Sequence, residues 1–150
     1  GKDAWKKHAL EFLRASNYAG IAFGHAGCAA VHAMAYPLGG VHHIPHGQAN
    51  QLMFADVMRK YQEKKPIGKL NQLEELLSAE LDVEPVFALE NLYELMDEVL
   101  KKDPLHEHGV TADELPVFAK NVIGTQQRLL GNNYVELTED DLLDIYRKAF

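Results

Sequence analysis

The sequence predicts an all-α fold, a multi-helix bundle. Apolar residues, many of them leucines, recur at three- and four-residue spacing along most of the chain, and prolines or capping patterns separate the stripes. Only residues 134–137 have the character of a strand, and a single short strand has no partner with which to form a sheet. With 150 residues and 47% hydrophobic content, the chain is long enough to bury the core of one such domain.

The first helical stretch extends from Trp5 to Ala35 and is rich in Ala, Leu and Phe. Pro37 follows it, and because the residue before a proline is pushed out of the helical conformation, we expect the helix to end near Tyr36. Glycines inside this stretch each cost about 1 kcal/mol relative to Ala at exposed sites. Their presence indicates that another backbone or a ligand approaches closely; they are Gly20, Gly24 and Gly27.

Two more helices follow. One begins at His46 or Gly47 and ends near Lys64, where Lys64 and Lys65 complement the negative end of the helix dipole. The next is expected to hold Pro66 in its first turn, where a proline is tolerated, with leucines at helical spacing behind it. These leucines are Leu70, Leu73, Leu76, Leu77 and Leu81.

The last third of the chain predicts three helices separated by loops. Pro85 opens the first, whose apolar stripe from Leu89 to Leu100 is typical of core. Thr111 has capping-box spacing to Glu114 for the second, although Pro116 indicates an irregular first turn. Thr138 caps the third. Residues 131–133 form a turn, and the loop over 103–109 carries two histidines that we expect to be solvated, His106 and His108.

The composition and the net charge exclude several classes of partner and location. A net charge of −7 argues against nucleic acid and against anionic membrane surfaces, both of which select clustered positive charge. No segment approaches the roughly 20 consecutive apolar residues of a membrane span, and the opening residues do not form a secretory signal. The single cysteine, Cys28, excludes an internal disulfide and is expected to be an inert core thiol. We therefore expect a cytoplasmic protein.

The histidines are the most informative residues. Five of the eight lie between His25 and His46. A helix that presents His32, followed by a Pro/Gly turn that returns His46, can bring two imidazoles to one metal ion. From spacing alone, a coincidental cluster of surface or core histidines is an equal alternative.

The residues around this pair resemble a known signature. His32-Ala33-Met34-Ala35-Tyr36-Pro37-Leu38-Gly39-Gly40, followed by Ile44-Pro45-His46-Gly47-Gln48-Ala49-Asn50, closely resembles that of the iron-dependent (group III) alcohol dehydrogenases. Tyr36, the Gly-Gly pair and the segment 43–46 look most like the 4-hydroxybutyrate dehydrogenase branch. The two segments together are specific, although the diagnostic motifs occupy only residues 18–50.

The resemblance implies a helical C-terminal domain of the type shared with dehydroquinate synthase. It implies that His32 and His46 are metal ligands for Fe(II) or Zn(II), which two imidazoles do not distinguish. It also implies an NAD(P) cofactor and a small alcohol or aldehyde substrate, with interconversion of 4-hydroxybutyrate and succinate semialdehyde as the expected reaction. The cation that would hold the substrate carboxylate is unassigned, since only histidines lie near the motif and Arg14 and Arg59 are further away in sequence.

One position departs from the family pattern. Many members carry a second histidine where this chain has Tyr36, and a tyrosine with a pKa near 10 is a poorer proton shuttle at neutral pH. We expect Tyr36 and His43 to be the catalytic residues, with His42 as the alternative relay. The competing interpretation is that Tyr36 only packs and that both loop histidines are exposed. Asn50 is expected either to orient a ligand or, preferably, to cap the loop.

Other family features are missing from residues 1–150. No strand precedes a Gly-x-Gly-x-x-Gly turn and a helix, as a dinucleotide-binding domain requires. The Asp and His that complete the family's metal site upstream have no counterpart before residue 32. We therefore expect a single metal-binding domain, the C-terminal fragment of a longer enzyme, which pairs with its own N-terminal nucleotide-binding domain and is inactive alone.

Two alternatives remain. The first is a metal-dependent cyclising lyase of the dehydroquinate synthase type, although that family typically continues His-Gly with Glu-Ala-Val, whereas here Gln48 follows Gly47. The second is a stand-alone helical metal-binding module, which would need further ligands from His25, His42, His43 or a carboxylate. The acidic helices would also allow a homo-oligomer interface, which no sequence feature demands.

Overall fold

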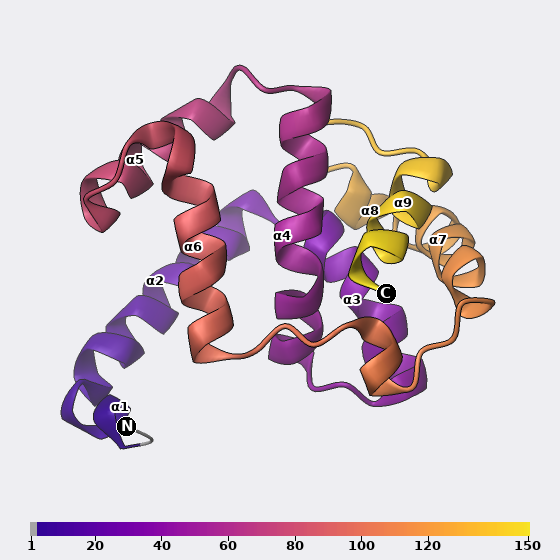
Figure 1. Ribbon diagram of the computed structural model, residues 1–150, viewed down its shortest axis with the longest axis horizontal. Helices are drawn as coiled ribbons and strands as arrows, with labels where there is room; N and C mark the ends of the chain where they lie inside the picture. Colours follow the sequence, from indigo (N-terminus) through magenta and orange to yellow (C-terminus); the bar gives the residue numbers. More distant parts are fainter. Residues whose placement is uncertain (1–2) are drawn as a thin grey trace.

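The computed structural model describes residues 3–150, except for the side chain of Ala4, and confirms the all-α prediction (Figure 1). Within these residues every regular element is a helix, and residues 134–137, the one segment with the character of a strand, form none. None of the described helices is long and apolar enough to cross a membrane. In chain order the elements are α1 (Ala4–Lys7), α2 (Ala9–Ala26), α3 (Ala30–His42), α4 (His46–Lys64), α5 (Lys69–Leu81), α6 (Pro85–Val99), the 3₁₀ turn η1 (Leu105–His108), α7 (Glu114–Thr125), α8 (Gln127–Leu130) and α9 (Glu139–Ala149).

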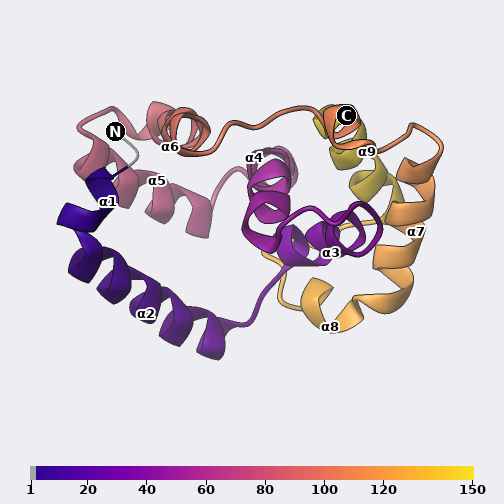
Figure 2. The ribbon, with the colours of Figure 1, turned by 90° about the horizontal axis from the view of Figure 1, so that it is seen from below.

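The core lies around α3 and α4, which pack against each other, with α7 and α9 covering them from one side (Figures 1 and 2). The largest fully buried side chains come from these helices and from η1; they include Met34, Leu38, Leu52, Met53, Leu105, Leu142, Ile145 and Tyr146. Alanines on the inner face of α3 allow the close approach to α4, since they are small and completely buried; they are Ala30, Ala33 and Ala35.

A polar contact ties the start of α3 to α4. The side-chain oxygen of Asn133 accepts hydrogen bonds from the backbone N–H of Ala30 and from the Tyr61 hydroxyl, both at 2.8 Å. Burial raises the pKa of Tyr61 to about 12, so its hydroxyl stays a donor at neutral pH. The turn predicted at 131–133 therefore connects the segment between α8 and α9 to both central helices.

The predicted continuous helix over residues 5–35 is wrong, because it is divided into α1, α2 and α3. α2 ends at Gly27, whose φ of 77° is readily adopted only by glycine. A side chain at Gly27 would also collide with the amide of Asn132, which donates to the backbone carbonyl of Cys28. The expectation of a close approach thus holds at Gly27, whereas Gly20 and Gly24 have nothing within 4 Å.

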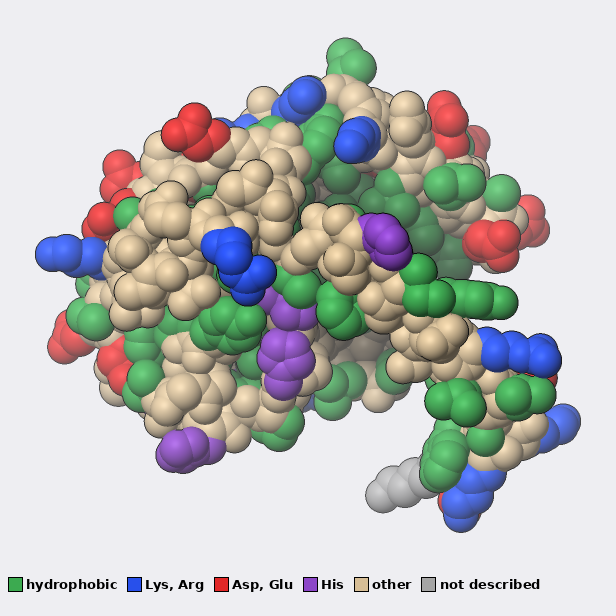
Figure 3. All heavy atoms as spheres, turned by 180° about the vertical axis from the view of Figure 1, so that it is seen from behind, with side chains coloured by type: hydrophobic (Ala, Val, Ile, Leu, Met, Phe, Trp, Pro, Cys, Tyr) green, Lys and Arg blue, Asp and Glu red, His purple; other side chains and the backbone are tan. Residues whose placement is uncertain are grey.

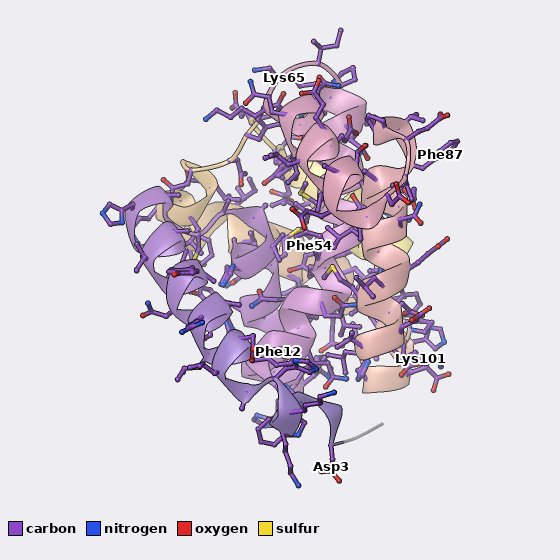
Figure 4. The ribbon with its side chains drawn as sticks, turned by 90° about the vertical axis from the view of Figure 1, so that its left-hand side faces the viewer. Asp3, Phe12, Phe54, Lys65, Phe87 and Lys101 are labelled. Atoms are coloured by element: carbon purple, nitrogen blue, oxygen red, sulfur yellow. The ribbon has the colours of Figure 1, made fainter. Side chains whose placement is uncertain are left out.

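α2 projects away from the core (Figure 2), and none of its residues is buried. Its large apolar side chains point in several directions and are more than half exposed, namely Leu10, Phe12, Leu13, Tyr18, Ile21 and Phe23. Figures 1 and 2 show α2 and α6 on the same side of α4, and Figure 4, seen from that side, shows them apart from each other, with Phe12 on α2 and Phe54 on α4. A helix that is apolar all round is typical of one buried in a larger structure.

The predicted end of the helix near Tyr36 is also wrong, since α3 continues through Pro37 to His42. A proline inside a helix costs about 3 kcal/mol, because a backbone donor is lost and the ring crowds the preceding turn. Leu38, the next residue, is completely buried, and its burial in the core favours the continued helix. Tertiary packing therefore outweighs the local preference at this proline.

The remaining helices follow the predicted signals closely. α6 begins at Pro85, and α9 begins after Thr138, which forms a capping box with Asp141. α7 begins at Glu114, whose carboxylate accepts from the backbone of Thr111. α5, however, begins at Lys69, so Pro66 lies in the preceding turn rather than in the helix. The apolar stripes of α5 and α6 are only partly buried, since Leu76 and Val99 are exposed while Leu89 is covered.

Candidate metal centre

His32 and His46 lie next to each other, His32 in the first turn of α3 and His46 as the first residue of α4. The centroids of their rings are 5.2 Å apart, and the ring planes are tilted by 55°. Residues 43–45 alone separate α3 from α4, and Pro45 precedes the first residue of α4 with a φ of −54°. Because the fixed φ of a proline suits a helix start, the turn places His46 in the first turn of α4. Figure 3 shows a group of histidine side chains among apolar ones in the middle of the face that is turned away in Figure 1.

The electrostatics of His32 favour a neutral imidazole. His32 is half-buried, and this burial, followed by repulsion from His46, lowers the pKa of His32 below its ordinary value of 6.5. The neutral ring retains a nitrogen lone pair at neutral pH, and that lone pair is what a metal ion requires. The chemistry of this donor set therefore suits a divalent transition metal.

Tyr36 joins the pair from the same helix as His32. It follows His32 by one helical turn and is 43% exposed. Its ring centroid is 6.5 Å from that of His46, with the planes 29° apart. The hydroxyl-bearing ring thus stands beside the imidazoles at the surface of the domain, where a small molecule can reach it.

His42 lies in a different environment. It is half-buried, its Nε2 is 3.1 Å from the Glu114 carboxylate, and its ring meets the edge of Phe118 at 6.0 Å between centroids. The backbone and hydroxyl of Thr111 also bind Glu114, and these hydrogen bonds contribute to the lowered pKa of the Glu114 carboxyl. His42 therefore links the end of α3 to the start of α7, and this contact competes with a role as proton relay.

His43 and His25 are both exposed. His43 ends α3 in the left-handed conformation, with a φ of 56°, and within residues 3–150 no ring contact joins it to His32, Tyr36 or His46. His25 lies on α2, with Nδ1 2.8 Å from the carbonyl of Ile21 in the preceding turn. The structure thus groups Tyr36 with the two imidazoles and leaves His43 outside that group.

Of the two roles expected for Asn50, orienting a ligand and the preferred capping of the loop, the structure favours the first, because Asn50 lies against His46. Its side-chain Nδ2 lies 3.0 Å from Nε2 of His46. Its Oδ1 is buried and has no hydrogen-bond partner in the described part of the chain. The spacing of four residues between His46 and Asn50 is the signal that could have identified the contact.

No third ligand joins the pair in the part of the chain that the structure describes. No cluster of three or more His, Cys, Asp or Glu side chains there is arranged to hold a metal ion. Cys28 is half-buried and packs against the core, in agreement with a structural thiol. The prediction that the two loop histidines are solvated is wrong for His108, whose Nε2 is buried, while His106 is exposed and bonds the carbonyl of Phe150.

Arg59 is paired with an acidic residue of α6. Its guanidinium makes two hydrogen bonds to the carboxylate of Glu90, with the shorter at 2.6 Å, and lies 5.0 Å above the Tyr93 ring. These residues line a cavity of about 560 Å³ between α4 and α6. Because Arg59 is already paired, it is a poor candidate for binding a substrate carboxylate.

Comparison with known proteins matches this architecture to one family. The sequence model described as "Fe-containing alcohol dehydrogenase family, C-terminal" matches residues 1–150. The chain is 44% identical over 140 residues to a 4-hydroxybutyrate dehydrogenase of Clostridium kluyveri, covering 93% of this chain and 38% of that protein. It is 34% identical over 149 residues to long-chain-alcohol dehydrogenase 1 of Geobacillus thermodenitrificans, covering 97% of this chain and 38% of that protein.

A third relative and a solved structure are also similar to this chain. Lactaldehyde reductase of Escherichia coli K12 is 31% identical over 163 residues, which cover all of this chain and 40% of that protein. A crystal structure of 1,3-propanediol oxidoreductase superposes with a TM-score of 0.67 at 25% identity, covering 81% of this chain and 32% of that one. The chain therefore spans about two fifths of the length of these curated relatives.

Proposed function

Since this chain belongs to the Fe-containing alcohol dehydrogenase family, we propose that it is the metal-binding C-terminal domain of an NAD(P)-dependent alcohol dehydrogenase. The observation that carries the proposal is the pair of adjacent imidazoles, His32 in the first turn of α3 and His46 at the start of α4. Membership of this family also sets aside the dehydroquinate synthase-type lyase.

His32 and His46 would hold the metal. His32 is suited to this because its lowered pKa leaves the ring neutral, and His46 because it is exposed at the start of a helix. When bound, a divalent iron or zinc ion supplies Lewis acidity to an alcohol or aldehyde oxygen, and NAD(P) supplies the hydride acceptor. Two imidazoles serve either metal equally well.

Tyr36 would orient the reacting oxygen. Its hydroxyl is a hydrogen-bond donor at neutral pH, and its ring stands beside that of His46 at the surface. A proton released from the substrate would leave through an imidazole, and we assign that relay to His43. Its exposure supports this role, because an exposed imidazole exchanges protons with water directly.

The substrate we propose is a short ω-hydroxy acid, with interconversion of 4-hydroxybutyrate and succinate semialdehyde. The support is the 44% identity to a 4-hydroxybutyrate dehydrogenase along most of the chain. The group that binds the substrate carboxylate would come from outside the domain, since Arg59 is committed to Glu90.

We further propose that this domain packs on an N-terminal nucleotide-binding domain and is inactive alone. The length of the relatives supports this, and so does α2, whose apolar side chains find no cover within the described residues. A cytoplasmic location belongs to the same proposal and rests on the single thiol, which has no disulfide partner in the sequence.

The experiment is a titration of metal-stripped protein with zinc and with iron(II), on the 150-residue chain and on a longer protein that contains it. We expect weak binding by the chain and tight binding by the longer protein, lost in His32→Ala and in His46→Ala but kept in His25→Ala. Tight one-to-one binding by the chain alone would instead favour a stand-alone metal module. Retention of metal by both His32→Ala and His46→Ala would overturn the ligand assignment.

A further inference from the structure

The cavity between α4 and α6 has apolar walls and acidic side chains at its edge. Its volume of about 560 Å³ suits a small organic molecule. Figure 4 faces this side of the molecule, with Phe54 on α4 beside α6. Within the described residues, neither His32 nor His46 lines the cavity, so it is distinct from the candidate metal centre. The apolar walls come from both helices and consist of Phe54, Ala55, Tyr93 and Met96.

The two cations that line this cavity are already paired. The Arg59 guanidinium holds the Glu90 carboxylate through two hydrogen bonds. The Lys102 ammonium binds Asp56 of α4, a residue that is only 5% exposed. Neither cation is therefore free to neutralise the remaining carboxylates of the cavity.

Three carboxylates of α6 line the cavity without a cation beside them, namely Glu94, Asp97 and Glu98. All three are exposed, and none forms an ion pair in the part of the chain that the structure describes. Asp97 accepts a hydrogen bond of 2.7 Å from the backbone N–H of Lys102. Glu94 and Glu98 are one helical turn apart on α6, where like charges repel each other. A cation bound between these two carboxylates would relieve the repulsion.

The hydroxyl of Tyr93 is a buried polar group beside these carboxylates. Tyr93 is 8% exposed, and its oxygen has no hydrogen-bond partner within the described residues. Its ring lies among other residues of the cavity, 6.1 Å from the Phe54 ring and 5.0 Å from the Arg59 guanidinium. Burial raises the pKa of this hydroxyl far above its ordinary value, so its oxygen remains neutral and can accept a hydrogen bond. Because an unpaired buried polar group is unfavourable, a ligand that donates to it would be stabilised.

We propose that this cavity binds an alkylammonium group, with the ammonium at Glu94 and Glu98 and the alkyl chain against Phe54 and Tyr93. The N–H groups of an ammonium match these carboxylates and the Tyr93 hydroxyl, which otherwise lack a partner. The alkyl chain covers apolar walls that an inorganic cation would leave in water. A carboxylate ligand is repelled by the same side chains, so the proposed hydroxy acid does not bind here.

The test is a titration of the 150-residue chain with hexylammonium at pH 7, followed by ¹H–¹⁵N NMR. Hexanol and hexanoate have the same chain without the positive charge and serve as control ligands. We expect one-to-one binding of hexylammonium with a Kd on the order of 1 mM, and shifts confined to α4 and α6. The two controls should bind at least about tenfold more weakly. Equal binding of hexanol, or no saturable binding of hexylammonium, would overturn the proposal.

Substitutions at the cavity test its residues. Glu94→Gln combined with Glu98→Gln should weaken hexylammonium binding about tenfold. Tyr93→Phe should weaken it by a smaller factor and still fold, because the hydroxyl it removes has no partner in the described chain. The matched control is Glu75→Gln with Glu80→Gln, which changes two exposed carboxylates of α5 outside the cavity. The same affinity in both double variants would contradict the assignment.

An alkylammonium group has two sources, a free amine and a lysine of the N-terminal domain under the proposed function, and a longer protein separates them. Binding of hexylammonium by the longer protein identifies a free amine. No binding there, with destabilisation by the Glu94→Gln and Glu98→Gln pair relative to the control pair, identifies a lysine. Neither effect would overturn the proposal. The titration of the 150-residue chain needs no metal, so its failure is distinguishable from failure of the proposed function.

Discussion

The hydroxyl of Tyr146 on α9 donates a hydrogen bond of 2.8 Å to the backbone carbonyl of Met34 on α3. Both residues are fully buried, and burial raises the pKa of Tyr146 far above its ordinary value, so the hydroxyl stays a donor at every physiological pH. Met34 is two residues from His32. The last helix of the chain therefore holds the helix that carries one of the two proposed metal ligands.

Removing this contact should cost stability without removing apolar packing. Tyr146→Phe is expected to lower the free energy of unfolding by about 1 kcal/mol, the usual net value of one buried hydrogen bond. Urea denaturation followed by circular dichroism would measure it. Tyr18→Phe is the control, because Tyr18 is 67% exposed on α2. Equal stabilities of the two variants would contradict the structural role of Tyr146.

The break between α2 and α3 should tolerate only glycine. Gly27→Ala places a Cβ at a φ of 77° and against the Asn132 amide, so we expect a loss of more than 1 kcal/mol of stability. Gly24→Ala is the matched change inside α2, where nothing lies within 4 Å, and should instead gain up to about 1 kcal/mol through helix propensity. Thermal unfolding of both variants measures the difference, and a stabilised Gly27→Ala would refute the assigned conformation.

Acid should weaken the start of α9. Burial opposes ionisation of Asp141, but hydrogen bonds from Lys64 and then from Thr138 lower its pKa below the ordinary value of 3.8. A carboxyl with a lowered folded-state pKa contributes stability above its unfolded pKa, and this contribution disappears as the pH falls through the folded value. Asp141→Asn should therefore destabilise the protein at pH 7, and the difference from the unsubstituted chain should disappear as the pH falls below 3.8 and through the lower folded-state pKa.

The control for this change is Asp140→Asn, which removes the same charge from the first turn of α9 without a partner such as Lys64. Urea unfolding at pH 7 and pH 2.5 separates the two effects. A loss in Asp141→Asn that is the same at both values of pH would show that ionisation is not its cause.

The exposed side chains of α2 test the proposed domain contact. Leu13 is 68% exposed, so Leu13→Ser in the 150-residue chain should change stability by less than about 0.5 kcal/mol. In a longer protein that contains the chain, the same substitution should cost about 2 kcal/mol or more, because α2 would then be covered. Unfolding curves of the four proteins decide this, and equal small effects would mean that α2 stays uncovered.

In the longer enzyme, substitutions of Tyr36 and of His46 should have different effects on metal retention and on activity. His46→Ala is expected to abolish metal retention, measured by elemental analysis of purified protein. Tyr36→Phe should retain the metal, because its ring packing survives, while changing the pH profile of alcohol oxidation. Metal loss of the same size in both variants would reject this division of roles.

Sequence signals found those elements whose ends are set locally. Pro85 and Thr138 mark helix starts because a fixed φ and a capping side chain act within one turn, and both helices begin as predicted. The pairing of His32 with His46 could also be predicted from sequence. A helix, a short turn and a second helix leave few ways to arrange the residues that they carry.

The incorrect predictions concern positions where contacts between residues distant in sequence determine the structure. Pro37 is inside α3 because the burial of Leu38 offsets a locally unfavourable residue, and no local pattern reports that burial. At Gly27, which ends α2 with a positive φ, Asn132, more than a hundred residues away, leaves no room for a side chain. The pairing of His42 with Glu114 likewise joins distant segments, and His42 was therefore considered as a proton relay before its partner was known.

The three-residue turn between α3 and α4 has a consequence for how the protein folds. Helices joined by so short a connection lose little chain entropy when they meet, and contacts close in sequence form early. We therefore expect the hairpin that carries both imidazoles to assemble before α7 and α9 dock on it. During synthesis of the chain, the two proposed metal ligands would then already face each other while the last helix is still in the ribosome.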